Sequence, residues 1–246
     1  MDATNLKTRM NTKVQALSER EPGTSQYLAL TSNALELIQE NLKHQPLSFQ
    51  LFDMVKSPSG GSTVFSVPGL SGEEAEKELT GIILDYTTPR AYWATSDPVE
   101  GMPPTCLSKD SLVSQDGKAC AHCPFNDFGS KDGDSPAKAC KESVLLFLLR
   151  PGSVFPLLVR VPVTSKKIFL KYTTRLVSRL TPLSSVVTKI TLEKATSREG
   201  KPYALFHFDA VQILDQETAA KAREFGKQFM EFVNAADVEP VFTQAS

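Results

Sequence analysis

The chain has 246 residues, of which 41% are hydrophobic and 22% charged, and its net charge at pH 7 is −1. This is ordinary globular composition, and a chain of this length can bury a core without help from a cofactor. No apolar run follows the first seven residues, and the most apolar stretch, 144–163, is interrupted by Arg150, Pro151, Gly152 and Arg160. We therefore expect a soluble, cytoplasmic protein (host cytoplasm if viral) with no membrane segment.

The first 80 residues are predicted to hold one helix and two short strands after a polar start. Residues 1–22 are polar and expected to be mobile, and leucine spacing predicts a helix over 24–42 that ends before Pro46. Further along, the pattern predicts strands over 47–55 and 63–67 with a Gly-Ser turn between them. The Gly- and Glu-rich stretch 68–80 is expected to be a connector with one helical turn.

The core is predicted to follow from residue 81. Strands are expected over 81–87, 90–95, 143–150 and 155–162, then a helix over 165–180 capped by Thr164 or Ser165. A hairpin of strands 186–195 and 203–214 comes next, and Asp215 is expected to cap a last helix, 217–233, before a flexible tail, 234–246. The apolar stripe of that helix, which contains Phe225, Phe229 and Phe232, suits either the core or a homodimer contact.

The order of these elements predicts the fold class. Three strands, a helix and two more strands is the order of an oligonucleotide-binding (OB) barrel, although other mixed α+β domains share it. We therefore expect an α+β, mainly β domain over 23–233, an OB-fold-like barrel with a zinc-binding module inserted at about 97–141 and a C-terminal helix. It remains open from the sequence whether the first 80 residues complete the barrel or form a separate lobe.

The chain's four cysteines are spaced Cys106-x13-Cys120-x2-Cys123-x16-Cys140 and lie in a segment with almost no apolar periodicity. Four thiolates at such spacing are typical of a closed, structural Zn²⁺ site, which leaves no open position for catalysis. An iron–sulfur cluster uses the same ligands, whereas a redox pair is disfavoured by the absence of a strand-to-helix context. Metal ligation would replace the hydrophobic core that this segment lacks.

Charge is distributed unevenly along the chain. Residues 138–201 hold 13 Lys or Arg and three acids, whereas 71–100 holds seven acids against two bases. This polarity favours a polyanionic partner, although scattered solvated lysines would give the same count. Aromatic side chains that could stack on bases and cations that could contact phosphates are the candidate nucleic-acid-binding residues: Arg90, Tyr92, Trp93, Phe125, Phe128, Lys138, Lys141, Lys166, Lys167, Lys171, Arg175 and Tyr203.

Alternative roles exist for these residues. Phe125 and Phe128 could instead anchor the cysteine-rich segment to the core, and Phe206 and Phe208 are expected in the core. Catalytic patterns are poor, because the three histidines are isolated and no phosphate-binding glycine loop is present. Asp85 and Asp209 are the best pair for two-metal nuclease chemistry, but an ordinary structural role is the stronger expectation for each. Because the sequence holds no convincing catalytic set, we expect a protein that is not an enzyme.

The cysteine-rich segment resembles a set of phage-encoded single-stranded DNA-binding proteins. The resemblance rests on Pro104–Asp110 and on Cys120-x2-Cys123-Pro124-x-Asn126-x-Phe128-Gly129-Ser130, followed by Lys138-Ala139-Cys140-Lys141. It implies sequence-tolerant binding of single-stranded DNA in viral replication or recombination, zinc held by the four cysteines, and replication or recombination proteins as partners. Many such proteins end in a strongly acidic tail, whereas this tail holds only Asp237 and Glu239.

The leading expectation is therefore single-stranded DNA binding, with RNA as an open possibility. The rival from another class is a zinc-stabilised protein-interaction or scaffold domain, in which the aromatics are core and the lysines are solvated. A metal-dependent nucleic-acid enzyme is the third alternative. Salt-sensitive binding would separate the first from the second, because counterions are released when phosphates meet lysines.

Overall fold

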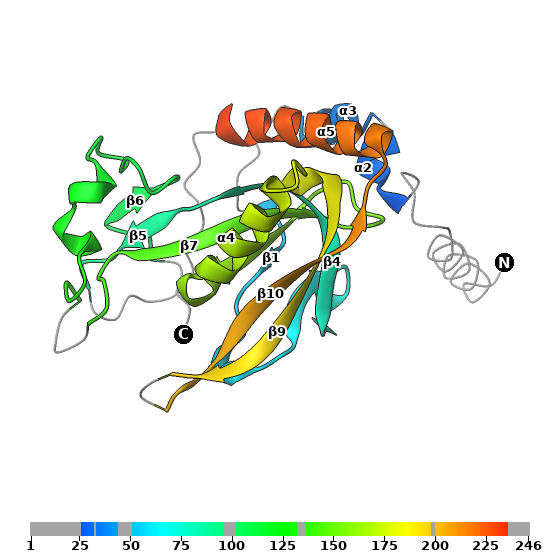
Figure 1. Ribbon diagram of the computed structural model, residues 1–246. Coiled ribbons are helices and arrows are strands. Elements are labelled where there is room, and N and C mark those ends of the chain that lie inside the picture. Colours follow the sequence, from blue (N-terminus) through cyan, green and yellow to red (C-terminus); the bar gives the residue numbers. More distant parts are fainter. Residues whose placement is uncertain are drawn as a thin grey trace.

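A computed structural model of the protein describes residues 26–31, 33–43, 51–95, 102–131, 136–197 and 200–235. The fold is mixed α+β and mainly β, with a curled sheet and a C-terminal helix, as the sequence predicted (Figure 1). The predicted mobile N-terminus, the first part of the strand expected over 47–55, and residues 236–246 of the tail lie outside the described residues.

The main sheet has its strands in the order β1-β8-β7-β4-β9-β10, with β5 pairing to β7 and β6 to β5. All neighbours are antiparallel except β1 and β8. A separate hairpin joins β2 to β3. The bounds are β1 Met54–Val55, β2 Phe65–Gly69, β3 Gly72–Glu76, β4 Glu78–Thr87, β5 Arg90–Tyr92, β6 Cys106–Ser108, β7 Lys141–Leu149, β8 Leu157–Pro162, β9 Val186–Thr196 and β10 Pro202–Ile213.

Strand β7 is apolar on both faces because both faces are covered. Val144, Leu146 and Leu148 face one hydrophobic core, and Leu145, Phe147 and Leu149 face the other. This continuous apolar run is what a strand buried on both sides requires. The segment 144–163 is thus built mainly of β7 and β8, as predicted. No helix in the described part of the chain is long and apolar enough to cross a membrane.

Helices cover the two faces separately. Helix α4 (Val163–Val177) contacts β8, β7 and β10, and the sheet curls around it (Figure 1). On the opposite face lie α5 (Gln216–Ala235), α2 (Leu28–Thr31) and α3 (Ala34–Leu42). Phe225 and Phe229 of α5 are buried in that second core. The apolar stripe of α5 therefore packs on the sheet, which was one of its two predicted uses.

Strand β4 is shared between two neighbours. Its first half, Glu78–Ile82, pairs with β9, and its second half, Ile82–Thr87, pairs with β7, with a register shift between Ile83 and Asp85. At the changeover, a Cβ on Gly81 would lie 2.4 Å from the carbonyl oxygen of Leu149. Only glycine allows the two strands to approach this closely.

Two local predictions are wrong. The stretch 68–80 is not a connector with a helical turn, because it holds the end of β2, all of β3 and the start of β4. Its glutamates other than Glu76 are exposed, so the alternating apolar pattern used for prediction is lost. Ser165 and Thr164 do not cap α4, which begins at Val163 after Pro162. The buried Ser165 hydroxyl accepts a hydrogen bond from the Phe206 amide instead, at 3.0 Å.

The cap of the last helix is as predicted. The Asp215 carboxylate accepts hydrogen bonds from the Thr218 amide at 2.9 Å and from the Thr218 hydroxyl at 2.6 Å. These bonds hold the pKa of Asp215 below its ordinary value. The ionised side chain thus satisfies an amide that the first turn of α5 leaves without a helical partner.

The cysteine-rich insertion between β5 and β7 has almost no apolar interior. Among its described residues, only Leu107 and Cys120 are buried hydrophobic side chains, and Leu107 packs with Ala91 and Trp93. Regular structure in these residues is limited to β6 and two single 3-10 turns, η4 (Cys120–His122) and η5 (Pro124–Asn126). The predicted lack of a hydrophobic core in this segment is confirmed.

Candidate functional site

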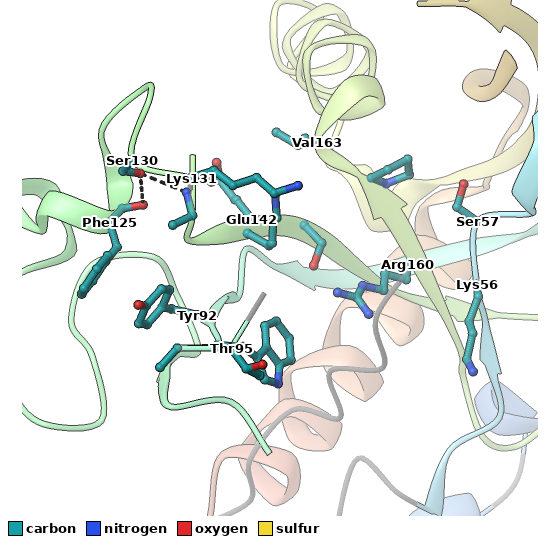
Figure 2. Close-up of a pocket in the computed structure, with 16 residues that line it drawn as sticks. Lys56, Ser57, Tyr92, Thr95, Phe125, Ser130, Lys131, Glu142, Arg160 and Val163 are labelled. Carbon is teal, nitrogen blue, oxygen red and sulfur yellow. Dashed lines mark hydrogen bonds between the residues drawn. The ribbon is translucent and has the colours of Figure 1, made fainter. Parts of the chain in front are cut away.

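A hollow of about 370 Å³ opens where the insertion meets the first residues of β7 and the last residues of β8 (Figure 2). Alternation along the strands places Ser143 and Arg160 on the same side of the sheet as Leu145 and Phe147, the face that α5 covers further along. The hollow therefore opens mainly on the face opposite α4, although Val163, the first residue of α4, and Glu142 also line it. Its lining residues are Lys56, Ser57, Tyr92, Trp93, Ala94, Thr95, Phe125, Ser130, Lys131, Ala139, Lys141, Glu142, Ser143, Arg160, Pro162 and Val163.

One wall of the hollow is aromatic. The rings of Tyr92 and Phe125 are stacked, with centroids 4.0 Å apart and planes 13° from parallel. Trp93, the next residue along, is half-buried, and its indole N–H donates to the carbonyl of Met102 at 3.0 Å. Phe125 is 40% exposed. It therefore joins the insertion to β5, which is one of its two predicted roles, and it leaves part of its surface uncovered; stacking on a base stays a prediction.

The remaining walls carry positive charge. Lys131 and Lys141 come from the insertion side, and Arg160 and Lys56 lie across the hollow from Tyr92 and Phe125 (Figure 2). Burial lowers the pKa of Lys141, and repulsion from Lys131 lowers it further. Burial also lowers the pKa of Arg160. Four cations in the lining favour an anion in the hollow.

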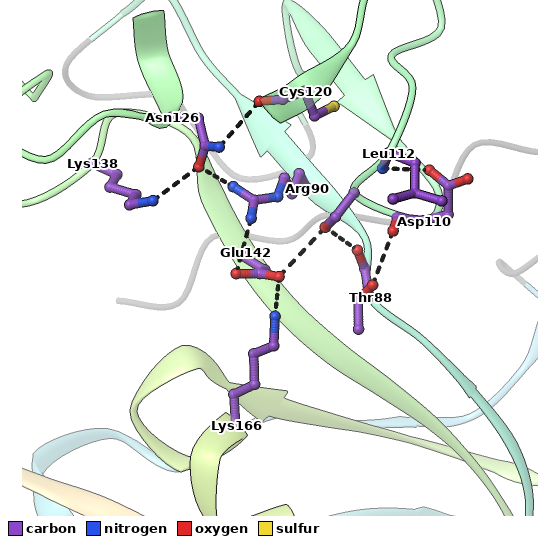
Figure 3. Close-up of polar contacts among 10 residues, drawn as sticks. Thr88, Arg90, Asp110, Leu112, Cys120, Asn126, Lys138, Glu142 and Lys166 are labelled. Atoms are coloured by element: carbon purple, nitrogen blue, oxygen red, sulfur yellow. Dashed lines mark hydrogen bonds and ion pairs between the residues drawn. The ribbon is translucent and has the colours of Figure 1, made fainter. Parts of the chain in front are cut away.

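Glu142 is the one acidic side chain among the described residues of the lining, and its charge is already paired (Figure 3). Its carboxylate lies 3.2 Å from Arg90 and also accepts from Lys166 of α4. Side-chain exposure is 14% for Glu142, 13% for Arg90 and 25% for Lys166. The network links β5, β7 and α4, so Arg90 and Lys166, both predicted to contact nucleic acid, lie just behind the hollow rather than in its lining.

Asn126 extends this network into the insertion (Figure 3). Its side-chain oxygen accepts from Arg90 and, at 3.1 Å, from Lys138, while its side-chain N–H donates to the carbonyl of Cys120 at 3.0 Å. The turn that carries Cys120 and Cys123 is thus tied to the core through one amide. Because Phe125 follows this turn closely in the chain, the position of the turn also sets the position of Phe125 in the aromatic wall.

The four cysteines lie in one region of the insertion. Cys106 is on β6, Cys120 and Cys123 flank η4, and the Cys140 amide donates to the Phe125 carbonyl at 2.8 Å. All four are free thiols. Burial first, and then the neighbouring cysteines, raise the pKa of Cys140 to about 11, although Arg90 opposes this. Burial, Asp116 and the other thiols likewise raise the pKa of Cys106.

The thiols therefore affect one another electrostatically, but they have not converged. In the described ranges, no three His, Cys, Asp or Glu side chains lie close enough together to hold a metal ion. The same finding covers the described carboxylates, so Asp85 and Asp209 do not form part of such a cluster. Zinc binding and two-metal chemistry stay predictions that the geometry as it stands does not supply.

The other predicted nucleic-acid-binding residues lie elsewhere. Phe128 is 83% exposed, and the Lys138 ammonium lies 4.6 Å from its ring centroid, outside the hollow. Lys167, Lys171 and Arg175 are exposed on α4, which packs on the opposite face of the sheet. Tyr203 is half-buried near the tip of the β9–β10 hairpin, close to η3 (Ser59–Gly61). Of the predicted residues, Tyr92, Trp93, Phe125 and Lys141 line this hollow, whereas Lys171 and Arg175 line a second one beside His207 and Asp209.

Sequence reasoning missed Lys56, Lys131 and Arg160. Lys56 follows β1, and this strand reaches the site only through its parallel pairing with β8. Arg160 interrupts an apolar run, a signal that served only to exclude a membrane segment. Alternation along 157–162 could have placed Arg160 on the face opposite Val159 and Val161, as the structure does.

Comparison with known proteins adds no assignment: no protein-family model, no curated protein and no solved structure matches this chain.

Proposed function

We propose that the protein binds single-stranded nucleic acid, single-stranded DNA in the first place, through the hollow, and that it does so without catalysis. The observation that carries the proposal is the composition of the hollow. An aromatic wall of Tyr92, Phe125 and Trp93 faces a set of cations, and the acid in the lining, Glu142, is paired. Proteins that bind single strands without sequence preference combine stacking rings with a positive groove in this way.

The connectivity of the sheet supports the same proposal. If β4 and β5 together are the first strand, then β7, β8, α4, β9 and β10 follow in the order of an OB fold. In that fold the face of the second and third strands, with the loop before them, binds oligonucleotides. The hollow lies on the outer face of β7 and β8, beside the loop that precedes β7. Among the described strands β10 pairs only with β9, so the proposed barrel is an open one.

For the insertion we propose a bound Zn²⁺ held by Cys106, Cys120, Cys123 and Cys140, with a structural role. The supporting facts are that the thiols are free, that they influence one another, and that almost no apolar core holds this segment. Four thiols are the donor set of structural zinc sites, but these thiols would have to draw closer together to bind it. When bound, zinc would supply cross-linking of the segment and no chemistry.

The binding test uses fluorescence anisotropy of a labelled strand of about 30 nucleotides, longer than one OB fold covers. The strand is titrated at two salt concentrations and compared with duplex of the same sequence. We expect tight binding that prefers the single strand and weakens as salt rises. The double substitution Lys131→Ala with Lys141→Ala should reduce the slope of log K against log salt by about 2, because each lysine is expected to neutralise one phosphate.

A matched control removes the same charge from another surface. Lys221 and Arg223 are exposed in the first half of α5 and do not line the hollow. The double substitution Lys221→Ala with Arg223→Ala should leave the salt slope unchanged. Absence of binding at low salt, or equal weakening in both double variants, would refute the proposed site. The first of these outcomes would favour a zinc-stabilised protein-interaction domain.

Zinc is tested separately. The purified protein is denatured and the metal released is measured with a colorimetric chelator, with Cys120→Ser combined with Cys123→Ser as the comparison. We expect about one zinc per chain, and none in the double variant, since four thiolates make one structural site. A brown protein with visible absorbance would instead indicate an iron–sulfur cluster. Protein with neither metal would contradict the proposed role of the cysteines.

A further inference from the structure

We infer that the hollow is a compartment for one nucleotide unit, with the base against the aromatic wall and the phosphate at the Lys131 and Lys141 edge, and that it therefore also takes a free mononucleotide. This inference rests on the proposed function and makes it more specific. It concerns the size, the wall chemistry and the charge arrangement of the hollow.

The size of the hollow limits its occupant. At about 370 Å³ it lies at the small end of the range for small-molecule sites, which runs from about 300 to 1,000 Å³. Such a volume suits one flat ring system with its attached sugar phosphate, not a run of stacked bases. A base seated here must leave the stack of its neighbours, which a single strand permits at much lower cost than a duplex.

The aromatic wall leaves a limited stacking surface. Tyr92 and Phe125 each use one ring face to cover the other, because their centroids are 4.0 Å apart and their planes nearly parallel. A ligand can therefore extend this stack only on an outer face. Phe125 has 40% of its surface exposed and offers such a face. The preformed pair favours one further flat ring, since neither side chain has to be ordered on binding.

The charges are placed for a phosphate beside that ring. Lys131 and Lys141 both line the hollow, and the Lys141 ammonium donates to the Lys138 carbonyl at 3.2 Å. A phosphate beside both ammonium groups is attracted by each of them. Glu142, next to Lys141 in the chain, does not neutralise them, because Arg90 and Lys166 hold its carboxylate. Across the hollow, Arg160 is a further cation in the lining (Figure 2).

The chain carries its own reporter, because Trp93 is its only tryptophan and lines the hollow. Intrinsic fluorescence is followed during titration with thymidine monophosphate, with thymidine and with deoxyribose 5-phosphate. We expect saturable quenching by the mononucleotide, weaker binding of the nucleoside, and no quenching by the sugar phosphate. The mononucleotide should also displace a labelled oligonucleotide in the anisotropy assay.

Two variants assign the parts of the ligand. The double substitution Lys131→Ala with Lys141→Ala should lower the affinity for the mononucleotide but leave the affinity for thymidine unchanged. Phe125→Ala should weaken both ligands, roughly five- to 150-fold, as expected when one base can no longer stack. Lys221→Ala with Arg223→Ala is again the control and should behave as the unmodified protein.

The failure of this inference differs from the failure of the proposed function. If the labelled strand binds but the mononucleotide neither quenches Trp93 nor competes, the compartment is refuted and strand binding stands. If the mononucleotide binds, but the Lys221→Ala, Arg223→Ala variant reduces its affinity as much as the Lys131→Ala, Lys141→Ala variant does, its site is not the hollow and the inference is wrong. If neither the strand nor the mononucleotide binds, both proposals are refuted.

Discussion

Glu142→Gln is the substitution that best tests how the insertion is held on the core. Glutamine keeps the shape and one acceptor oxygen but removes the charge that faces Arg90 and Lys166. Truncating one partner of a fully buried ion pair costs about 3–5 kcal/mol of folding free energy. With 13–25% exposure among these three side chains, solvent screens part of that effect. We therefore expect the free energy of unfolding to fall by about 2 kcal/mol.

The assay is urea denaturation followed by circular dichroism, supported by thermal melts. A fall of about 2 kcal/mol corresponds to a decrease of about 4–8 °C in Tm for a chain of this size. Glu217→Gln is the matched control, because Glu217 forms an exposed pair with Lys221 at 2.6 Å, with side chains 77% and 44% exposed. This control should cost no more than about 0.5 kcal/mol.

A double-mutant cycle then isolates the ion pair itself. Arg90→Met is combined with Glu142→Gln, and the coupling energy is the departure of the double variant from additivity. We expect a coupling of about 1–2 kcal/mol of the stabilising sign, within the range measured for residues that share a network. A destabilisation by Glu142→Gln no larger than that by Glu217→Gln, or a coupling of zero, would refute the claim that this network fixes the insertion.

Three further predictions concern the core and the helix ends. Leu180, just after α4, is 93% exposed and has a left-handed backbone with φ of 54°, which glycine adopts without strain. Leu180→Gly should therefore raise the stability by about 1 kcal/mol in a thermal melt, whereas the control Arg179→Gly should lower it. Phe229 is fully buried among other rings, so Phe229→Ala should cost about 3–5 kcal/mol in urea denaturation; a negligible effect would show that α5 is not part of the core. The Thr218 hydroxyl and amide lower the pKa of Asp215 in the folded protein below its ordinary value of 3.8. The ionised Asp215 cap therefore stabilises the fold fully above pH 3.8, and this stabilisation is lost as the pH falls through the lowered folded pKa. The Tm deficit of Asp215→Asn should accordingly shrink as the pH is lowered from neutral to below that folded value, and a deficit that does not change with pH would contradict this.

Much of the core could be predicted because its pattern is local. The alternation around Phe206 and Phe208 places both in the core, where the structure has them, and the Asp215 cap follows from one side chain at the start of an apolar period. Strand β2 was predicted over 63–67, but its partner β3 was missed because β3 consists almost entirely of glutamate and glycine, so strand pairing rather than burial defines it. Ser165 was misassigned because its partner, Phe206, is 41 residues away.

The candidate site was only half predictable for the same reason. Tyr92, Trp93, Phe125 and Lys141 come from segments whose composition signals a function. Lys56 and Arg160 enter the hollow through the β1–β8 pairing, which no local pattern specifies. The exposed cations of α4, Lys167, Lys171 and Arg175, do not line the hollow because the helix packs on the other face of the sheet. Their contact with nucleic acid stays a prediction.

The insertion and the hollow form one structural unit, and this bears on what zinc could contribute. Three kinds of contact already hold the insertion near Phe125: the ring stack on Tyr92, the Asn126 hydrogen bonds, and the backbone pairing of β6 with β5. The far loop at 111–119 is exposed apart from Ser111 and Ser114, and it is tied to the core at its first residue, where the Ser111 hydroxyl donates to the Thr88 carbonyl and, at 3.5 Å, to Glu142. Metal ligation would therefore order the cysteine turn and this loop more than the aromatic wall. The wall should keep its stack without metal, whereas the precise placement of Lys141, which directly follows Cys140, should depend on it.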